Sequence, residues 1–182
     1  CNGVTIVTAV RPIYVSPGGE QRGELVDFMY DRLALALAHT EGRIMVARNG
    51  NWGTFGPALP QNQATILSLV VQPDGFYRVY TNGVQAVTGA ASTPNFSTNM
   101  VPIGSQSFKQ YVNLGRNDPD GWSAYEGYLG DVFVYTNALG NVERQQLEAD
   151  LTAKFLASDY TITVFAGTGG YINPGGVVSV PP

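Results

Sequence analysis

The sequence predicts an all-β fold: an antiparallel β-sandwich of the jelly-roll type, with one short C-terminal helix and a trailing β-hairpin. Three observations predict it. Short apolar runs alternate with Gly, Pro and Asn turns along most of the 182 residues. Only 13% of residues are charged, against about 25% in a typical soluble domain, and Thr, Asn, Ser and Gly supply the polarity. Helical spacing of apolar residues is confined to one segment near residue 150.

The first half of the chain predicts short strands at residues 4–10, 24–30, 32–38 and 43–47. Ala and Leu favour helices, but Leu33, Leu35 and Leu37 alternate with alanines, and a period of two indicates a strand. The residues from 48 onward are expected to form a loop that carries Trp52 and Phe55.

The middle of the chain predicts two consecutive hairpins. Strands at residues 64–72, 76–80 and 84–87 are separated by a Pro-Asp-Gly turn and by the tight turn Asn82-Gly83, whose two positions tolerate positive φ. A long loop at residues 89–107 and strands at 111–114 and 128–135 follow.

The helix is predicted at residues 142–155. Asn141 is expected to cap it, and Glu143 lies in the first turn, where the helix dipole favours a negative charge. Leu147, Leu151 and Phe155 recur at intervals of four, so they form an apolar stripe that should dock on a sheet.

The chain is divided into a sandwich at residues 1–157 and a hairpin extension at 158–182. The extension predicts a strand at 160–166, a turn at 167–170 and a weaker strand at 171–180. A lone hairpin is marginally stable in water, so we expect it to pair with the main domain, a further module or another chain.

Three segments resemble the laminin-G-like branch of the concanavalin A-like lectin and glucanase superfamily: TIVTAVRP, PDGFYRVYTNGVQ, and NLGR followed by EGYLGDVFVYTNALGNVERQQLEADLTAKF. The resemblance covers residues 4–155 and implies the jelly roll and its closing helix. The residues that match the closing pattern are Gly130, Asp131, Tyr135, Asn137, Leu139, Glu143 and Arg144.

The chain departs from this family at its start, because only three residues precede residues 4–10 where relatives usually have one or two more strands. An edge or inner strand of the sandwich is therefore expected to be absent. Separately, YTITVFAGTGGYINPGGVVSV resembles the opening of β repeat modules in bacterial surface proteins, which implies an extracellular or cell-surface bacterial protein.

Charge and hydropathy exclude two kinds of partner. The net charge is −4 and no Lys/Arg cluster exists, so a nucleic-acid partner is not expected. The longest apolar run, residues 33–38, is too short to span a bilayer. Cys1 is the single cysteine and cannot form an intrachain disulfide; it is either an ordinary residue or the lipidated first residue of a lipoprotein.

No catalytic site is predicted. Laminarinase-type relatives carry acidic residues at alternate strand positions, and that spacing is absent. Glu24, Asp27 and Asp31 are the nearest cluster, but Glu24 and Asp27 would point to opposite faces of a regular strand. His39 is the sole histidine and is expected to be a polar turn residue.

One loop predicts a calcium site. Asn117, Asp118 and Asp120 crowd oxygen ligands into a short segment, which suits Ca²⁺, as in several relatives. The alternative is an Asx-type turn, because Asn-Asp-Pro-Asp-Gly forms turns without a metal.

A glycan site is predicted from Trp52, Phe55, Asn117, Trp122 and Tyr125, with rings stacking on sugars and Asn117 bonding hydroxyl groups. The alternative is that both tryptophans cover the ends of the core.

The favoured function is a non-catalytic extracellular binding or adhesion module, with a glycan or cell-surface ligand. The first alternative is a filament subunit whose C-terminal strands fill a neighbour's empty strand position. The residues expected to assemble it are Tyr160, Ile162, Val164, Tyr171 and Val177. A degenerate glycoside hydrolase is the second.

Overall fold

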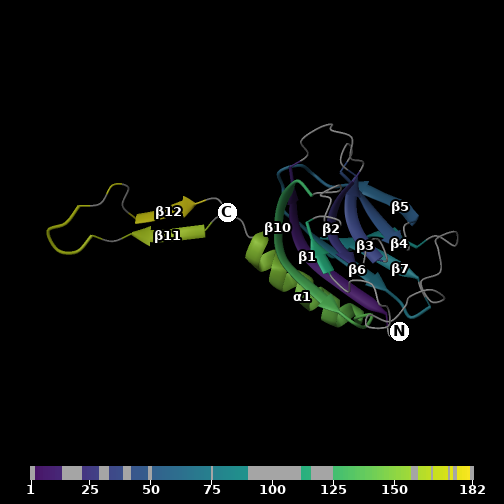
Figure 1. Cartoon of the computed structure of the whole chain (residues 1–182). Helices are drawn as coiled ribbons and strands as arrows, with labels where there is room; N and C mark the ends of the chain where they lie inside the picture. Colours follow the sequence, from purple (N-terminus) through teal and green to yellow (C-terminus); the bar gives the residue numbers. More distant parts are fainter. Residues whose placement is uncertain are drawn as a thin grey trace.

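Two stacked antiparallel sheets form the body of the protein (Figure 1). The computed structural model describes residues 3–13, 22–28, 33–38, 42–48, 51–74, 76–89, 112–115, 125–156, 160–164, 166–171, 173 and 176–180. Within these residues each sheet has five strands, which confirms the predicted β-sandwich.

The strand order of each sheet follows from its hydrogen-bonded neighbours. The first sheet runs β10 (Gly127–Tyr135), β1 (Val4–Pro12), β6 (Thr65–Val71), β7 (Tyr77–Thr81), β8 (Val84–Thr88). The second sheet runs β5 (Asn51–Ala58), β4 (Arg43–Arg48), β3 (Leu33–Ala38), β2 (Arg22–Phe28), β9 (Val112–Leu114).

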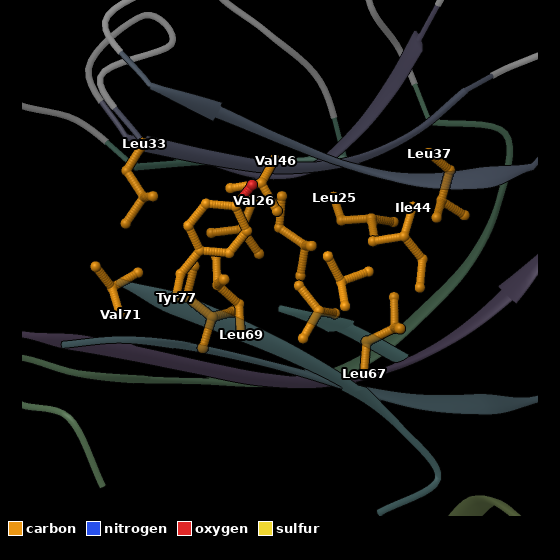
Figure 2. Close-up of a cluster of buried hydrophobic side chains, with 14 of the residues drawn as sticks. Leu25, Val26, Leu33, Leu37, Ile44, Val46, Leu67, Leu69, Val71 and Tyr77 are labelled. Atoms are coloured by element: carbon orange, nitrogen blue, oxygen red, sulfur yellow. The ribbon is translucent and has the colours of Figure 1, made fainter. Parts of the chain in front are cut away.

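The hydrophobic core fills the space between the sheets. Figure 2 shows Leu33, Leu37 and Val46 of the second sheet facing Leu67 and Leu69 of the first. The alternation of β3 divides its residues as predicted, because the leucines enter this core and the alanines point to the other face. A face of alanines is therefore left on the outside of the second sheet.

One strand-level prediction is wrong. Residues 51–53 are not loop: β5 begins at Asn51 and pairs with β4, so Trp52 and Phe55 belong to a strand. The prediction failed because Asn49, Gly50 and Asn51 are typical turn residues, and the expected loop was continued past them through Trp52. No inner strand is missing beside β1, since β10 and β6 pair with its two edges, whereas the absence of an edge strand stays a prediction.

Helix α1 (Asn141–Phe155) packs on the outer face of the first sheet, against β1 and β6. Its Leu147, Leu151 and Phe155 join Val7 and Ile66 in a second apolar cluster, which confirms the predicted stripe. The predicted cap is off by one residue.

The cap position is Gly140, and Asn141 is the first helical residue. Glu143 Oε2 accepts a hydrogen bond from the Gly140 amide at 3.1 Å. A carboxylate in the first turn therefore satisfies the backbone amide of the cap residue itself.

A buried polar network anchors the helix beside this cluster. Arg144 and Glu148 are only 3% and 4% exposed and form an ion pair at 2.5 Å. The Ser68 hydroxyl donates to Glu148 Oε1 at 2.6 Å, and the Arg144 guanidinium lies 3.6 Å from the centre of the Tyr80 ring. Both charges are thus compensated where water is excluded.

The C-terminal hairpin forms a two-stranded sheet of its own, from β11 (Tyr160–Val164) and β12 (Gly176–Val180). In Figure 1 the hairpin extends away from the sandwich beyond α1. Its two strands contact each other extensively, and neither makes extensive contact with another described helix or strand. Tyr160 and Ile162 pair with Val180 and Val178, whereas Val177 pairs with Thr163 in the alternate register. Tyr171 lies in the connection and is 87% exposed.

The described part of the chain contains no helix with the length and apolarity that crossing a membrane requires.

We predict that Arg144→Ala lowers the free energy of unfolding by about 3 kcal/mol, because it leaves the Glu148 carboxylate buried without its cation. Urea denaturation measures the change. Gln146→Ala is the matched control, because the Gln146 side chain is exposed on the same helix. It should change stability by no more than about 0.5 kcal/mol. Equal effects of the two substitutions would contradict a buried anchor.

We predict that a chain ending at Ser158 keeps the unfolding free energy of the whole chain to within about 0.5 kcal/mol, because β11 and β12 add little to the sandwich. Light scattering should also give the same association state for both chains. A change in that state would contradict this expectation and support assembly through the hairpin.

Candidate functional site

A β-bulge in β2 decides which of its side chains reach the outer face of the second sheet. Glu24 pairs with Ala36 and Val26 with Leu35, so Leu25 is an extra residue in the strand. Leu25 and Val26 both enter the core. Glu24 and Asp27 consequently lie opposite Ala36 and Ala34, two residues of the same face.

The prediction that Glu24 and Asp27 point to opposite faces is therefore wrong. It assumed unbroken alternation, and the extra residue between them restores both carboxylates to one side of the sheet.

The pairing registers continue this face across the sheet as two rows. The first row is Trp52, Ala47, Ala34, Asp27 and Asn113. The second row is Phe55, Met45, Ala36 and Glu24. Each row thus begins with an aromatic residue on the edge strand β5, crosses small or flexible residues on β4 and β3, and reaches a carboxylate on β2. We call this set the two-row face.

The two-row face is buried from β2 as far as β4. Glu24, Asp27, Ala34, Ala36 and Ala47 all have 0% exposure. Asn113 Nδ2 donates to Asp27 Oδ2 at 3.4 Å, so the amide of β9 partners one of the carboxylates. A buried carboxylate needs such partners to offset its lost hydration.

The structure brings some of the predicted glycan residues together and separates another. Trp52 and Phe55 share the two-row face by register. Tyr125 belongs to the opposite edge of the sheet: its amide bonds Gly115 O at 2.7 Å, just after β9, and its ring packs on the core. With four strand spacings of about 4.8 Å between β5 and β9, these two edges are ~19 Å apart.

Several predicted residues lie outside the described part of the chain: Asp31, His39, Asn117, Asp118, Asp120 and Trp122. No group of three or more His, Cys, Asp or Glu side chains able to hold a metal occurs among the residues that are described. The calcium site at Asn117, Asp118 and Asp120 stays a prediction.

The sequence analysis missed Ala34, Ala36, Met45 and Ala47, which line the middle of the face, and Asn113 at its β9 end. The alternating alanines of β3 carried a usable signal, because a strand with one leucine face must present its alanines on the other. No comparable pattern in the sequence indicates that Trp52 pairs with Ala47.

The comparisons with known proteins establish the fold. No family model matches the sequence, and no curated protein matches it. Solved structures do match, at identities of 16% to 19% for the three reported below, and this likeness shows a shared β-sandwich fold.

Three of these structures show the range of the similarity. A proposed carbohydrate-binding protein from Bacteroides ovatus is 16% identical with a TM-score of 0.60, over 80% of this chain and 40% of its own. The CBM40 of the Ruminococcus gnavus IT-sialidase, bound to α2,3-sialyllactose, is 16% identical with a TM-score of 0.59, over 81% and 82%. Domain 4 of an extracellular arabinanase from Geobacillus stearothermophilus, in complex with arabinotriose, is 19% identical with a TM-score of 0.55, over 81% and 66%.

Proposed function

We propose that this chain is a non-catalytic carbohydrate-binding domain of an extracellular protein, and that sugar binds at the β5 end of the two-row face. The observation that carries the proposal is the register that aligns Trp52 and Phe55 with Ala47 and Met45. Two aromatic residues beside Ala47 and Met45 on one sheet face form an apolar platform, on which the apolar face of a sugar ring can stack.

The packing around β5 holds this platform in place. Gly56 is buried, and a Cβ atom added to it would lie 2.6 Å from Val87 Cγ2 and 3.1 Å from Ile44 Cβ. β5 is therefore pressed against β8 of the first sheet at the position just after Phe55. A rigid strand positions ligand-binding residues better than a loop does.

The burial of the carboxylates favours binding over hydrolysis. A glycosidase needs two carboxyl groups that reach the scissile bond and a water molecule. Glu24 and Asp27 share a face but are fully buried, and Asp27 is bonded to Asn113. Their role in this proposal is structural, and Asp27 is the acceptor that fixes Asn113 of β9 at the end of the sheet.

The solved structures support the class of ligand. The CBM40 module and the arabinanase domain are both complexed with oligosaccharides, and the Bacteroides protein is a proposed carbohydrate binder. At these identities the fold alone is shared, so the sugar that this chain binds is set by its own residues.

We predict that Trp52→Ala weakens binding of a glycan identified on an array at least ~10-fold, about 1.4 kcal/mol, because a central aromatic contact dominates the affinity of such sites. Titration calorimetry measures the change. Phe55→Ala should also weaken binding.

Phe76→Ala is the matched control, because Phe76 is an aromatic residue with 53% exposure in the turn between β6 and β7. It should bind as the native chain does. Native affinity in both Trp52→Ala and Phe55→Ala, with intact folding by circular dichroism, would exclude the β5 site.

We also predict that the native chain and the double variant Glu24→Gln/Asp27→Asn release no reducing sugar from the glycan that binds, because the carboxylates are closed to substrate and water. A reducing-end assay tests this. Hydrolysis by the native chain that the double variant abolishes would instead establish the hydrolase alternative.

A further inference from the structure

The outer face of the first sheet has a second surface, beyond the end of α1. Phe155, the last residue of α1, packs on Gly130 of β10. A Cβ atom added to Gly130 would lie 2.9 Å from Phe155 Cζ and 3.1 Å from Ala9 Cβ. Two residues farther along β10 on the same face is Tyr128, which pairs with Arg11 of β1. The helix ends before it covers this pair.

Tyr128 presents an aromatic ring to solvent with a cation against it. Its exposed fraction is 57%, and the Arg11 guanidinium carbon lies 4.3 Å from the ring centre. A guanidinium stacked on a ring keeps its in-plane N–H donors free to bond other groups.

The charge of Arg11 is not compensated within the described residues. None of the carboxylates described forms an ion pair with it, and its Nε is buried without a hydrogen-bond partner among them. Lys154, at the end of α1, differs because Asp131 Oδ2 neutralises it at 2.6 Å. Arg11, beside the exposed ring of Tyr128, can therefore bind an incoming anion.

The backbone around the pair is fixed on both sides. The Tyr125 hydroxyl donates to Tyr128 O at 3.3 Å, and the Ile13 amide donates to Glu126 O at 3.0 Å. On the other side the Asn62 amide donates to Pro12 O at 2.8 Å, which holds a turn of three exposed amide side chains, Gln61, Asn62 and Gln63, beside β1. These amides can bond hydroxyl groups.

We propose that Arg11 and Tyr128 form a second saccharide site, separate from the two-row face, for a sugar that carries a carboxylate or sulfate group. The exposed side of the Tyr128 ring receives the apolar face of the sugar. The Arg11 guanidinium bonds the anionic group with two parallel N–H donors, and the amides of residues 61–63 bond its hydroxyl groups.

The overall charge makes this site distinguishable from general attraction. The chain carries a net charge of −4, so a polyanion is repelled by the molecule as a whole. Binding of an anionic glycan must then depend on a local cation, and it should weaken as salt rises.

The test measures affinity for two pairs of polymers with one backbone each: dextran sulfate against dextran, and polygalacturonate against its methyl ester. We expect the full chain to bind at least one anionic member and to prefer it over its neutral counterpart. Arg11→Gln and Tyr128→Ala should each weaken that binding at least ~10-fold, since a charge-assisted bond and a ring contact are lost. Tyr128→Phe keeps the ring and should stay within about 2-fold of native.

Arg78→Gln is the matched control, because Arg78 is an exposed cation on β7 of the same sheet. It should retain native affinity. Failure of the native chain to bind either anionic polymer, or an equal loss in Arg78→Gln, would overturn the proposal. Trp52→Ala should leave this binding intact, so its outcome separates the second site from the β5 site.

Discussion

The extra residue in β2 is the constraint on which the candidate site depends. Leu25 and Val26 both fill the core, and because they occupy two positions against one of β3, the next residue returns to the face of Glu24. Without that insertion one carboxylate would have to enter the apolar core, where an unpartnered charge costs several kcal/mol. Because of the bulge, Glu24 and Asp27 both lie on the two-row face, although they are three residues apart in the sequence, and neither enters the core.

The first sheet shows the complementary arrangement, in which a helix covers β1 and β6 on the outer face. Thr5 ties the connection before α1 to β1: its hydroxyl donates to Asn137 O and accepts from the Leu139 amide, both at 2.9 Å. The ion pair of Arg144 and Glu148 then fixes the first half of the helix over β6 and β7. Helix length therefore determines what stays open, and the fifteen residues of α1 end at Phe155, short of Tyr128.

Local patterns in the sequence predicted the fold well, because alternation, tight turns and a four-residue apolar stripe each report burial of one face. The division of β3 into leucine and alanine faces and the docking of α1 followed directly. The candidate site depends instead on registers between strands far apart in sequence. No local pattern shows that Trp52 pairs with Ala47, and a bulge inverts the alternation that a pattern assumes, as it did for Asp27.

The edges of the two sheets explain why side chains, rather than backbone pairing, are proposed to contact the ligand. β9 is three residues long, and β8 contacts β5 of the other sheet. β10 is a long edge, but its pairing with β1 is interrupted by a bulge, and the ion pair of Asp131 with Lys154 lies along it. Short edges, bulges and charges all oppose addition of a further strand. Binding through the aromatic residues of β5 and the Arg11–Tyr128 pair needs no such addition, because both surfaces use groups that the paired strands hold in place.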